Sequence, residues 1–155
     1  MELTETEAYN RAATYCAGAE HCRAEIAEKL QRWGIDPTSI PALLQRLETE
    51  KYIDEERYCR AYVNDKYRFA KWGKRKIAQG LYAKRIDSAI VRRCLDQVDE
   101  AEYLDILSAL LAAKRKSIRA QGEYELNQKL LRFAVGRGFE QDDIRRCMTV
   151  GEEYE

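Results

Sequence analysis

The sequence predicts an all-α protein, with about two and a half to three tandem three-helix repeats in an elongated, curved array. Its apolar residues recur at helical spacing, and no useful stretch alternates with the period of two that a half-buried strand requires. The chain also resembles itself at a fixed offset, which is the signature of a repeat protein. A shift of 51 residues places Ile26, Leu30, Ile35, Asp36, Leu44, Tyr52 and Asp54 on Ile77, Leu81, Ile86, Asp87, Leu95, Tyr103 and Asp105. A further shift of 53 residues adds Leu130, Ala134, Phe139, Ile144 and Met148.

The first helices follow from local signals. A helix is expected near 5–17, and a second one ends at Gly34, a residue type that often terminates helices. Asp36 followed by Pro37 is typical of a helix start, because aspartate caps the free N–H groups and proline fits the first turn. Asp54 is expected to cap a longer third helix, with Tyr58, Ala61, Tyr62 and Phe69 facing inward.

The later helices repeat this order. Gly73 interrupts the chain, and a helix with Ile77 and Leu81 follows. An Asp87-capped helix comes next, with Ile90, Val91, Leu95 and Val98 on its apolar face, and Asp105 is expected to lead into a long helix ended by Gly122. Two more helices are expected near 123–136 and 140–148. The predicted domains are an N-terminal helix (1–20), two full repeats (21–70 and 71–121), a partial repeat (122–150) and an acidic tail (151–155).

Composition limits the class of protein. The chain has 155 residues, of which 45% are hydrophobic and 35% charged, as expected for a helical protein with a real core. No apolar run approaches the roughly 20 residues of a membrane span, and the acidic start does not resemble a secretory signal. Five cysteines without framework spacing are interpreted as reduced, which predicts a cytoplasmic protein. A monomer is expected, because the third half-unit can cap the array.

The sequence contains no motif that indicates an enzymatic site or a metal site. The single histidine, His21, lies near Cys16 and Cys22, but structural zinc needs four ligands and no fourth cysteine or histidine is near. No glycine-rich phosphate loop or nucleophile elbow is present. We therefore expect a protein without catalytic residues, metal or cofactor.

The net charge of zero hides strong segregation. Between Lys66 and Arg93 there are ten basic residues and a single acid, Asp87. Cations neutralise phosphates and aromatic faces stack on unpaired bases, so this stretch is a candidate surface for an anionic partner. Phe69 and Trp72 at helical spacing are more often core residues than platforms for bases. The candidate contact residues are Lys66, Arg68, Lys71, Lys74, Arg75, Lys76, Lys84, Arg85, Arg92 and Arg93, with Lys114, Arg115, Lys116 and Arg119 as a second block.

Several motifs resemble the RecX family of bacterial recombination regulators. The segment Tyr52-Ile53-Asp54-Glu55-Glu56-Arg57-Tyr58-Cys59 is similar to the family pattern (Y/L)-(L/I)-(D/N)-D-x-x-(F/Y)-A, and Arg137-Gly138-Phe139 is similar to its R-G-F signature. Gly73-Lys74-Arg75-Lys76-Ile77 is similar to G-P-x-(K/R)-I. The chain lacks the proline after Gly73, the acid before Leu81 and the glycine before Ile86 that the family usually has. The ordered set covers about residues 8–148.

This resemblance implies a non-enzymatic regulator in DNA repair, recombination and the SOS response. Such proteins bind the RecA recombinase filament on single-stranded DNA, lie in its helical groove, and inhibit filament growth, ATP hydrolysis and strand exchange. Direct contact with single- or double-stranded DNA is also possible under this reading. Two alternatives stay open from the residues alone: a stand-alone nucleic-acid-binding helical-repeat protein, and a scaffold for another protein whose charged faces are merely solvated.

Overall fold

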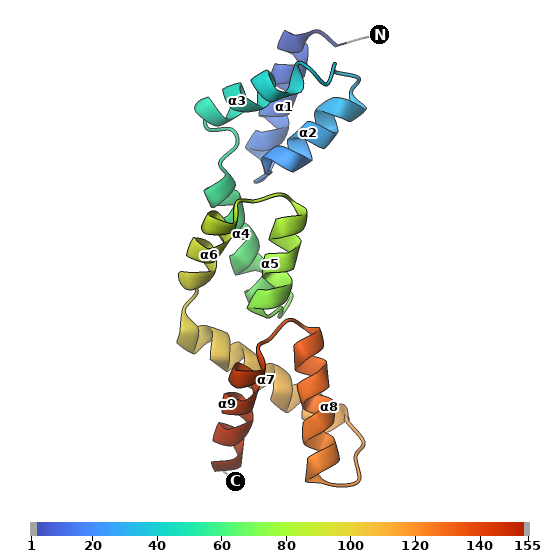
Figure 1. The fold of residues 1–155 in the computed structure, drawn as a ribbon, viewed down its shortest axis with the longest axis vertical. Coiled ribbons are helices and arrows are strands. Elements are labelled where there is room, and N and C mark those ends of the chain that lie inside the picture. The colour runs from blue at the N-terminus through green and yellow to red at the C-terminus, as the bar shows by residue number, and fades with distance from the viewer. Residues whose placement is uncertain (1–2, 154–155) are drawn as a thin grey trace. The chain divides into compact units, whose positions relative to one another are not determined.

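The computed structural model describes the backbone of residues 3–153 and the side chains of residues 3–148. Within this range the protein consists of nine helices and no strand, which confirms the all-α prediction (Figure 1). The predicted acidic tail lies outside the described side chains, and its residues 154 and 155 lie outside the described backbone. The helices are α1 (Glu5–Gly18), α2 (Arg23–Arg32), α3 (Ile40–Thr49), α4 (Glu55–Arg68), α5 (Lys74–Ala83), α6 (Ser88–Asp96), α7 (Glu100–Ser117), α8 (Glu123–Gly136) and α9 (Gln141–Glu153).

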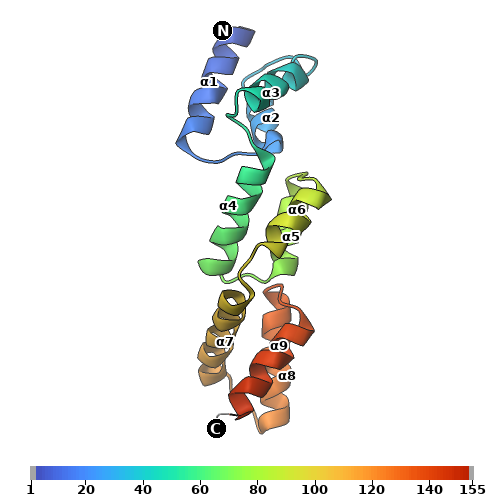
Figure 2. The same ribbon diagram turned by 90° about the vertical axis from the view of Figure 1, so that its left-hand side faces the viewer.

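The chain forms two compact units. The first unit comprises residues 1–61 and 81–92, and the second comprises residues 62–80 and 93–155. Helices α4, α5 and α6 contribute residues to both units. In the first unit, α1, α2 and α3 pack around a core that includes Ala12, Ile26, Leu30 and Leu47. In the second unit, α7, α8 and α9 pack on one another (Figure 2).

One turn recurs at the ends of α2, α5 and α8. The same turn also ends α3, where Lys51 has φ of 65° and Lys51 and Tyr52 donate to the carbonyls of Glu48 and Leu47 at 2.9 and 2.8 Å. Gly34, Arg85 and Gly138 all have left-handed backbone angles, with φ of 82°, 60° and 97°. Each donates its N–H to a carbonyl three residues earlier, at 3.0, 2.9 and 2.9 Å. The N–H of the following residue reaches back five residues, at 3.1, 3.2 and 3.1 Å. This pair of bonds defines a Schellman motif, and the copies at Gly34, Arg85 and Gly138 have the spacings of 51 and 53 residues found in the sequence.

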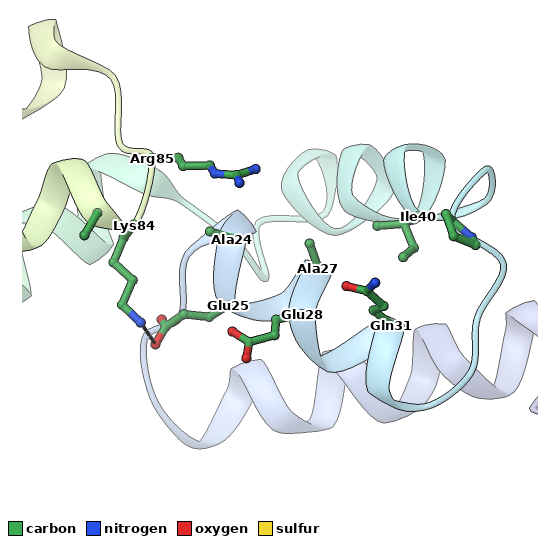
Figure 3. Close-up of a pocket in the computed structure, with 10 residues that line it drawn as sticks. Ala24, Glu25, Ala27, Glu28, Gln31, Ile40, Lys84 and Arg85 are labelled. Carbon is green, nitrogen blue, oxygen red and sulfur yellow. Dashed lines mark ion pairs between the residues drawn. The ribbon is translucent and has the colours of Figure 1, made fainter.

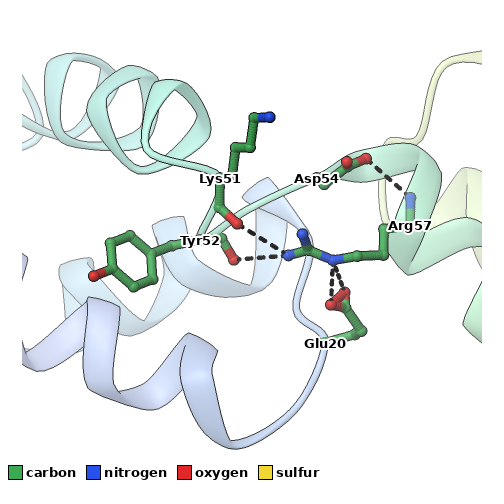
Figure 4. Close-up of polar contacts among 5 residues, drawn as sticks. All are labelled: Glu20, Lys51, Tyr52, Asp54 and Arg57. Atoms are coloured by element: carbon green, nitrogen blue, oxygen red, sulfur yellow. Dashed lines mark hydrogen bonds and ion pairs between the residues drawn. The ribbon is translucent and has the colours of Figure 1, made fainter.

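An arginine ties the start of α4 to the preceding helices within the first unit (Figure 4). Arg57 Nε donates to both carboxylate oxygens of Glu20, in the α1–α2 loop. Its Nη2 donates to the carbonyls of Lys51 and Tyr52, at 3.2 and 3.4 Å. Asp54 accepts from the N–H of Arg57 at 2.9 Å, so the predicted cap of α4 is correct. The guanidinium satisfies carbonyls that would otherwise be open at the end of α3.

Three buried aromatic side chains organise the core of the second unit. Tyr103 is fully buried, and its ring centroid lies 6.3 Å from that of Tyr67 and 5.5 Å from that of Phe139. The Tyr103 hydroxyl oxygen accepts from the backbone N–H of Lys74 at 3.0 Å. Burial raises the pKa of Tyr103 above its usual range, although the bond from Lys74 opposes this shift. Tyr103 therefore stays protonated and links α7 to the start of α5.

Two glycines bring the start of α5 against the α8–α9 turn. Gly73 donates its N–H to the carbonyl of Arg137 at 2.8 Å, and Arg75 donates to the carbonyl of Gly138 at 3.0 Å. A Cβ on Gly73 would lie 2.2 Å from the carbonyl carbon of Gly138, and a Cβ on Gly138 would lie 2.4 Å from Lys76 Cβ. Neither position has room for a side chain, so the backbones approach closely only because both residues are glycine.

The long helices differ from the expectation in their start and in their buried face. Asp105 was expected to lead into the long helix, but α7 begins at Glu100 and is capped by Asp99, which accepts from the N–H of Glu102 at 3.0 Å. The chain is six residues shorter between Asp87 and Asp99 than between Asp36 and Asp54, so the shift of 51 does not extend to α7.

The buried face of α4 is also rotated from the predicted one. Cys59, Val63 and Tyr67 are buried, whereas Ala61 is exposed and Phe69 is 78% exposed. Leu95 on α6 is only half-buried, because Val91 and Cys94 occupy the core.

Candidate interaction surfaces

A cluster of cations and one tryptophan lies at the α4–α5 connection in the second unit. Lys66 Nζ is 4.7 Å and Lys76 Nζ is 4.5 Å from the centroid of the Trp72 ring. Lys66 also lies 5.3 Å from the ring centroid of Tyr62. An ammonium near an aromatic ring is attracted by the ring quadrupole, so Trp72 holds both lysines in place. Trp72 is half-buried and serves as a cation-binding ring, whereas exposed Phe69 is the aromatic residue available for stacking.

Arg75 lies at the edge of a small cleft of about 190 Å³, which it lines together with Lys76, Gln79 and Gly138. Its side chain has no ion-pair partner among the described residues. The helix N-terminus beside it does not offer free donors. The N–H groups of Gly73, Lys74 and Arg75 bond to Arg137 O, Tyr103 Oη and Gly138 O. Any anion held here would be bound by side chains.

Four of the predicted contact residues are neutralised within the protein. Arg68 makes a two-pronged contact with Glu102, with distances of 2.7 and 3.2 Å. The other three pairs are Lys74–Glu100 at 3.1 Å, Lys84–Glu25 at 3.5 Å and Arg115–Glu123 at 3.0 Å. Removing the cation from such a pair leaves a carboxylate behind, so these residues are poor probes of partner binding.

The remaining predicted cations differ in their surroundings. Lys71 has φ of 59° and donates to the carbonyl of Arg68 at 2.9 Å. Lys114 lies 4.9 Å from the Phe133 ring centroid, while Lys116 and Arg119 are exposed near the end of α7. Arg92 and Arg93 are exposed on α6. Lys84, Arg85 and Arg92 belong to the first unit and the others to the second, so one continuous basic surface stays a prediction.

The first unit contains a groove of about 430 Å³ along α2 (Figure 3). Its apolar floor is formed by Ala24, Ala27 and Ile40, while Glu25, Glu28 and Gln31 add polar side chains. Lys84 and Arg85 border the groove at the α5–α6 turn. A cleft of about 200 Å³ shares Ala24, Ala27, Lys84 and Arg85 with it and extends to Leu44, Arg23 and Glu55. Sequence reasoning missed this groove, because its walls come from segments about 50 residues apart.

Two carboxylates near this groove have shifted pKa values. Burial disfavours ionisation of Glu25, but the N–H of Cys22 and the ammonium of Lys84 bring its pKa below the usual range. Burial raises the pKa of Glu55, with the backbone N–H of Arg23 opposing it. One Glu55 oxygen is buried without a hydrogen-bond partner.

A third hollow, of about 600 Å³, follows the outer face of α7 and includes Ile106, Ala109, Leu110 and Ala113. Leu110 is half-buried beside this hollow. Within the described residues, no three His, Cys, Asp or Glu side chains form a cluster fit for a metal ion. No helix in the same range is long and apolar enough to cross a membrane.

These features define a class: a tandem three-helix repeat protein whose surface cations are partly paired and partly available. Models of the three RecX three-helix domains match residues 8–47, 54–95 and 100–148, in the order first, second and third. The chain belongs to the RecX family. The family models group α1–α3, α4–α6 and α7–α9, whereas the repeat found in the sequence places the long helix last. The two descriptions divide the same helices into units at different points.

Known relatives cover nearly the whole chain. It is 31% identical over 143 residues to the Regulatory protein RecX of Prosthecochloris aestuarii, with 92% of this chain and 91% of that protein covered. It is 30% identical over 148 residues to the Regulatory protein RecX of Herminiimonas arsenicoxydans, with 94% and 93% covered. The crystal structure of RecX from Lactobacillus salivarius shares the fold, with a TM-score of 0.82, 22% identity and 94% of both chains covered. Another crystal structure of a regulatory protein RecX has a TM-score of 0.86 at 21% identity and covers 94% of this chain and 71% of that one.

Proposed function

We propose that this protein is a regulator that binds the RecA recombinase filament on single-stranded DNA and inhibits its growth, ATP hydrolysis and strand exchange. The observation that supports this most is the match to all three RecX domains, in order, over residues 8–148. Its relatives bear the name Regulatory protein RecX. We propose no catalytic residues, so the protein would inhibit by occupying the surface of the filament.

The residues we propose for this contact are three cations, Arg75, Lys66 and Lys76, that form no ion pair with any described residue. In the second unit, Arg75 is exposed at a cleft, and Lys66 and Lys76 are held near Trp72. Fixed cations lose little conformational freedom on binding, so they contribute more than free lysines would. Segregated charge also orients the encounter with an anionic partner.

The direct test is single-stranded-DNA-dependent ATP hydrolysis by the cognate RecA, titrated with this protein at fixed salt. Loss of hydrolysis well below one molecule per recombinase monomer is expected if the protein acts on filament growth. Loss only near stoichiometric amounts would indicate coating of the filament, and a DNA-binding control without recombinase would separate this from competition for DNA. No inhibition at any ratio would refute the proposal.

A second candidate is a stand-alone single-strand binder. It is favoured by Phe69, which is 78% exposed and lies two residues before Lys71. An open aromatic ring beside cations is the arrangement on which unpaired bases stack. Under this alternative, Phe69→Ala weakens binding to single-stranded DNA in the absence of recombinase, whereas the first proposal requires the recombinase.

A further inference from the structure

Arg85 occupies a left-handed turn position at which glycine is the preferred residue type. The equivalent residues at the ends of α2 and α8 are Gly34 and Gly138, the one at the end of α3 is Lys51, and all four have positive φ. A side chain in the left-handed region is disfavoured, because Cβ crowds the carbonyl oxygen. A non-glycine residue kept in such a conformation is a reason to look for a function of its side chain.

The Arg85 side chain extends over the α2 groove (Figure 3). It is exposed, and it has no ion-pair or hydrogen-bond partner among the described residues. The other charges around the groove are largely compensated. Lys84 pairs with Glu25 at 3.5 Å, Arg23 pairs with Glu48 at 2.7 Å, and Arg32 pairs with Glu28. Arg85 is therefore the uncompensated cation of this groove.

The surroundings of Arg85 favour a carboxylate of a protein over a nucleic-acid phosphate. The groove and the adjoining cleft are lined by three cations and three carboxylates, so they carry no excess positive charge that would attract a continuous polyanion. The cations are Arg23, Lys84 and Arg85, and the carboxylates are Glu25, Glu28 and Glu55. The floor of Ala24, Ala27 and Ile40 is apolar, which suits a short peptide segment with small side chains. A single acidic side chain can meet the guanidinium in a two-pronged contact while its neighbours lie on that floor.

We propose that the α2 groove, bordered by Arg85, receives an acidic side chain from a segment of the protein partner. The inference rests on the proposed function only for the identity of that partner, the recombinase filament. It differs from a role of Arg85 in binding DNA, which the charge pattern of the sequence alone had suggested.

The test exploits the preference of this turn for glycine, the residue type found at Gly34 and Gly138. Arg85→Gly restores the residue type that the turn prefers, so its melting temperature is expected to equal or exceed that of the unaltered protein. Its affinity for the RecA filament on single-stranded DNA, measured by fluorescence anisotropy, is expected to fall roughly tenfold or more. Its affinity for the same DNA without recombinase is expected to stay unchanged. Arg60→Gln, which removes an exposed arginine of α4 in the first unit, is the matched control and is expected to bind normally.

Two further variants test the apolar floor of the groove and the acidic residue of the partner. Ala27→Leu fills the floor and keeps the charge, and it is expected to weaken filament binding as well. Arg85→Lys places an amine at the same site, and treatment with a carbodiimide is expected to join it to an Asp- or Glu-containing peptide of the recombinase. Mass spectrometry would identify the peptide, and Arg85→Gln is expected to give no such product.

The outcomes separate the two proposals. If the unaltered protein binds the filament and Arg85→Gly binds it equally well, the groove inference is wrong and the proposed function stands. If Arg85→Gly loses affinity for DNA alone to the same extent, Arg85 contacts phosphate and the inference is again wrong. If the unaltered protein does not bind the filament, both proposals fail.

Discussion

Gly138 stabilises the second unit because it has no side chain at a close backbone contact. We expect Gly138→Ala to lower the free energy of unfolding by about 2–4 kcal/mol, because φ of 97° disfavours alanine and Cβ would lie 2.6 Å from the amide nitrogen of Lys76. Urea unfolding would measure this loss. Gly136→Ala is the matched control: nothing lies within 4 Å of its Cβ and it ends helix α8, so a neutral or slightly stabilising effect is expected. Equal effects at both positions would contradict the assigned contact.

Tyr9 makes the stability of the first unit sensitive to alkaline pH. Burial and the hydrogen bond that its hydroxyl donates to Glu50 raise the pKa of Tyr9 to about 12, above its usual value near 10. Because the folded pKa is the higher one, the contribution of Tyr9 is complete below pH 10 and is lost as the pH rises toward 12. Tyr9→Phe should therefore be less stable by about 1 kcal/mol at pH 8, and this gap should narrow above pH 10. Chemical unfolding of both proteins across this range measures the gap; a constant difference would argue against the assignment.

At the scale of elements, the start of α7 was the main error of sequence reasoning. Both Asp99 and Asp105 are capping residue types, and the repeat favoured Asp105. The structure uses Asp99, because a start at Glu100 lets Tyr103, Leu107 and Leu111 face α8 and α9. Helix 123–136, in contrast, was predicted with the bounds of α8, since Gly122 and Gly138 mark its two ends.

The two aspartates provide a test of this start. Asp99→Ala removes the acceptor for the N–H of Glu102 and is expected to lower the free energy of unfolding by about 1 kcal/mol. Asp105→Ala, on the exposed side of the same helix, is expected to change it by less than about 0.5 kcal/mol. Thermal or urea unfolding of the two variants measures these losses of stability. A larger loss for Asp105→Ala than for Asp99→Ala would indicate that the helix begins at Asp105.

At the scale of the whole molecule, zero net charge does not prevent binding to polyanions, because the charges are unevenly paired. If Arg75 contacts phosphate, Arg75→Gln should reduce the steepness of log K against log salt for single-stranded DNA by about 0.7. Titrations at several salt concentrations give this slope. Arg60→Gln changes the net charge equally and should leave the slope unchanged. Equal changes in both variants would indicate a general charge effect.

The sequence by itself determined the helices and turns of this protein, because these depend on residues a few positions apart. The Schellman turns at Gly34 and Gly138 and the cap at Asp54 are of this kind. Only the tertiary structure decided which cations remain available. Arg68 and Glu102 are 34 residues apart and pair because α4 meets α7 within the second unit, whereas Arg85 forms no ion pair with any described residue. Ion pairing and grooves depend on distances in space, and local sequence patterns do not determine those distances.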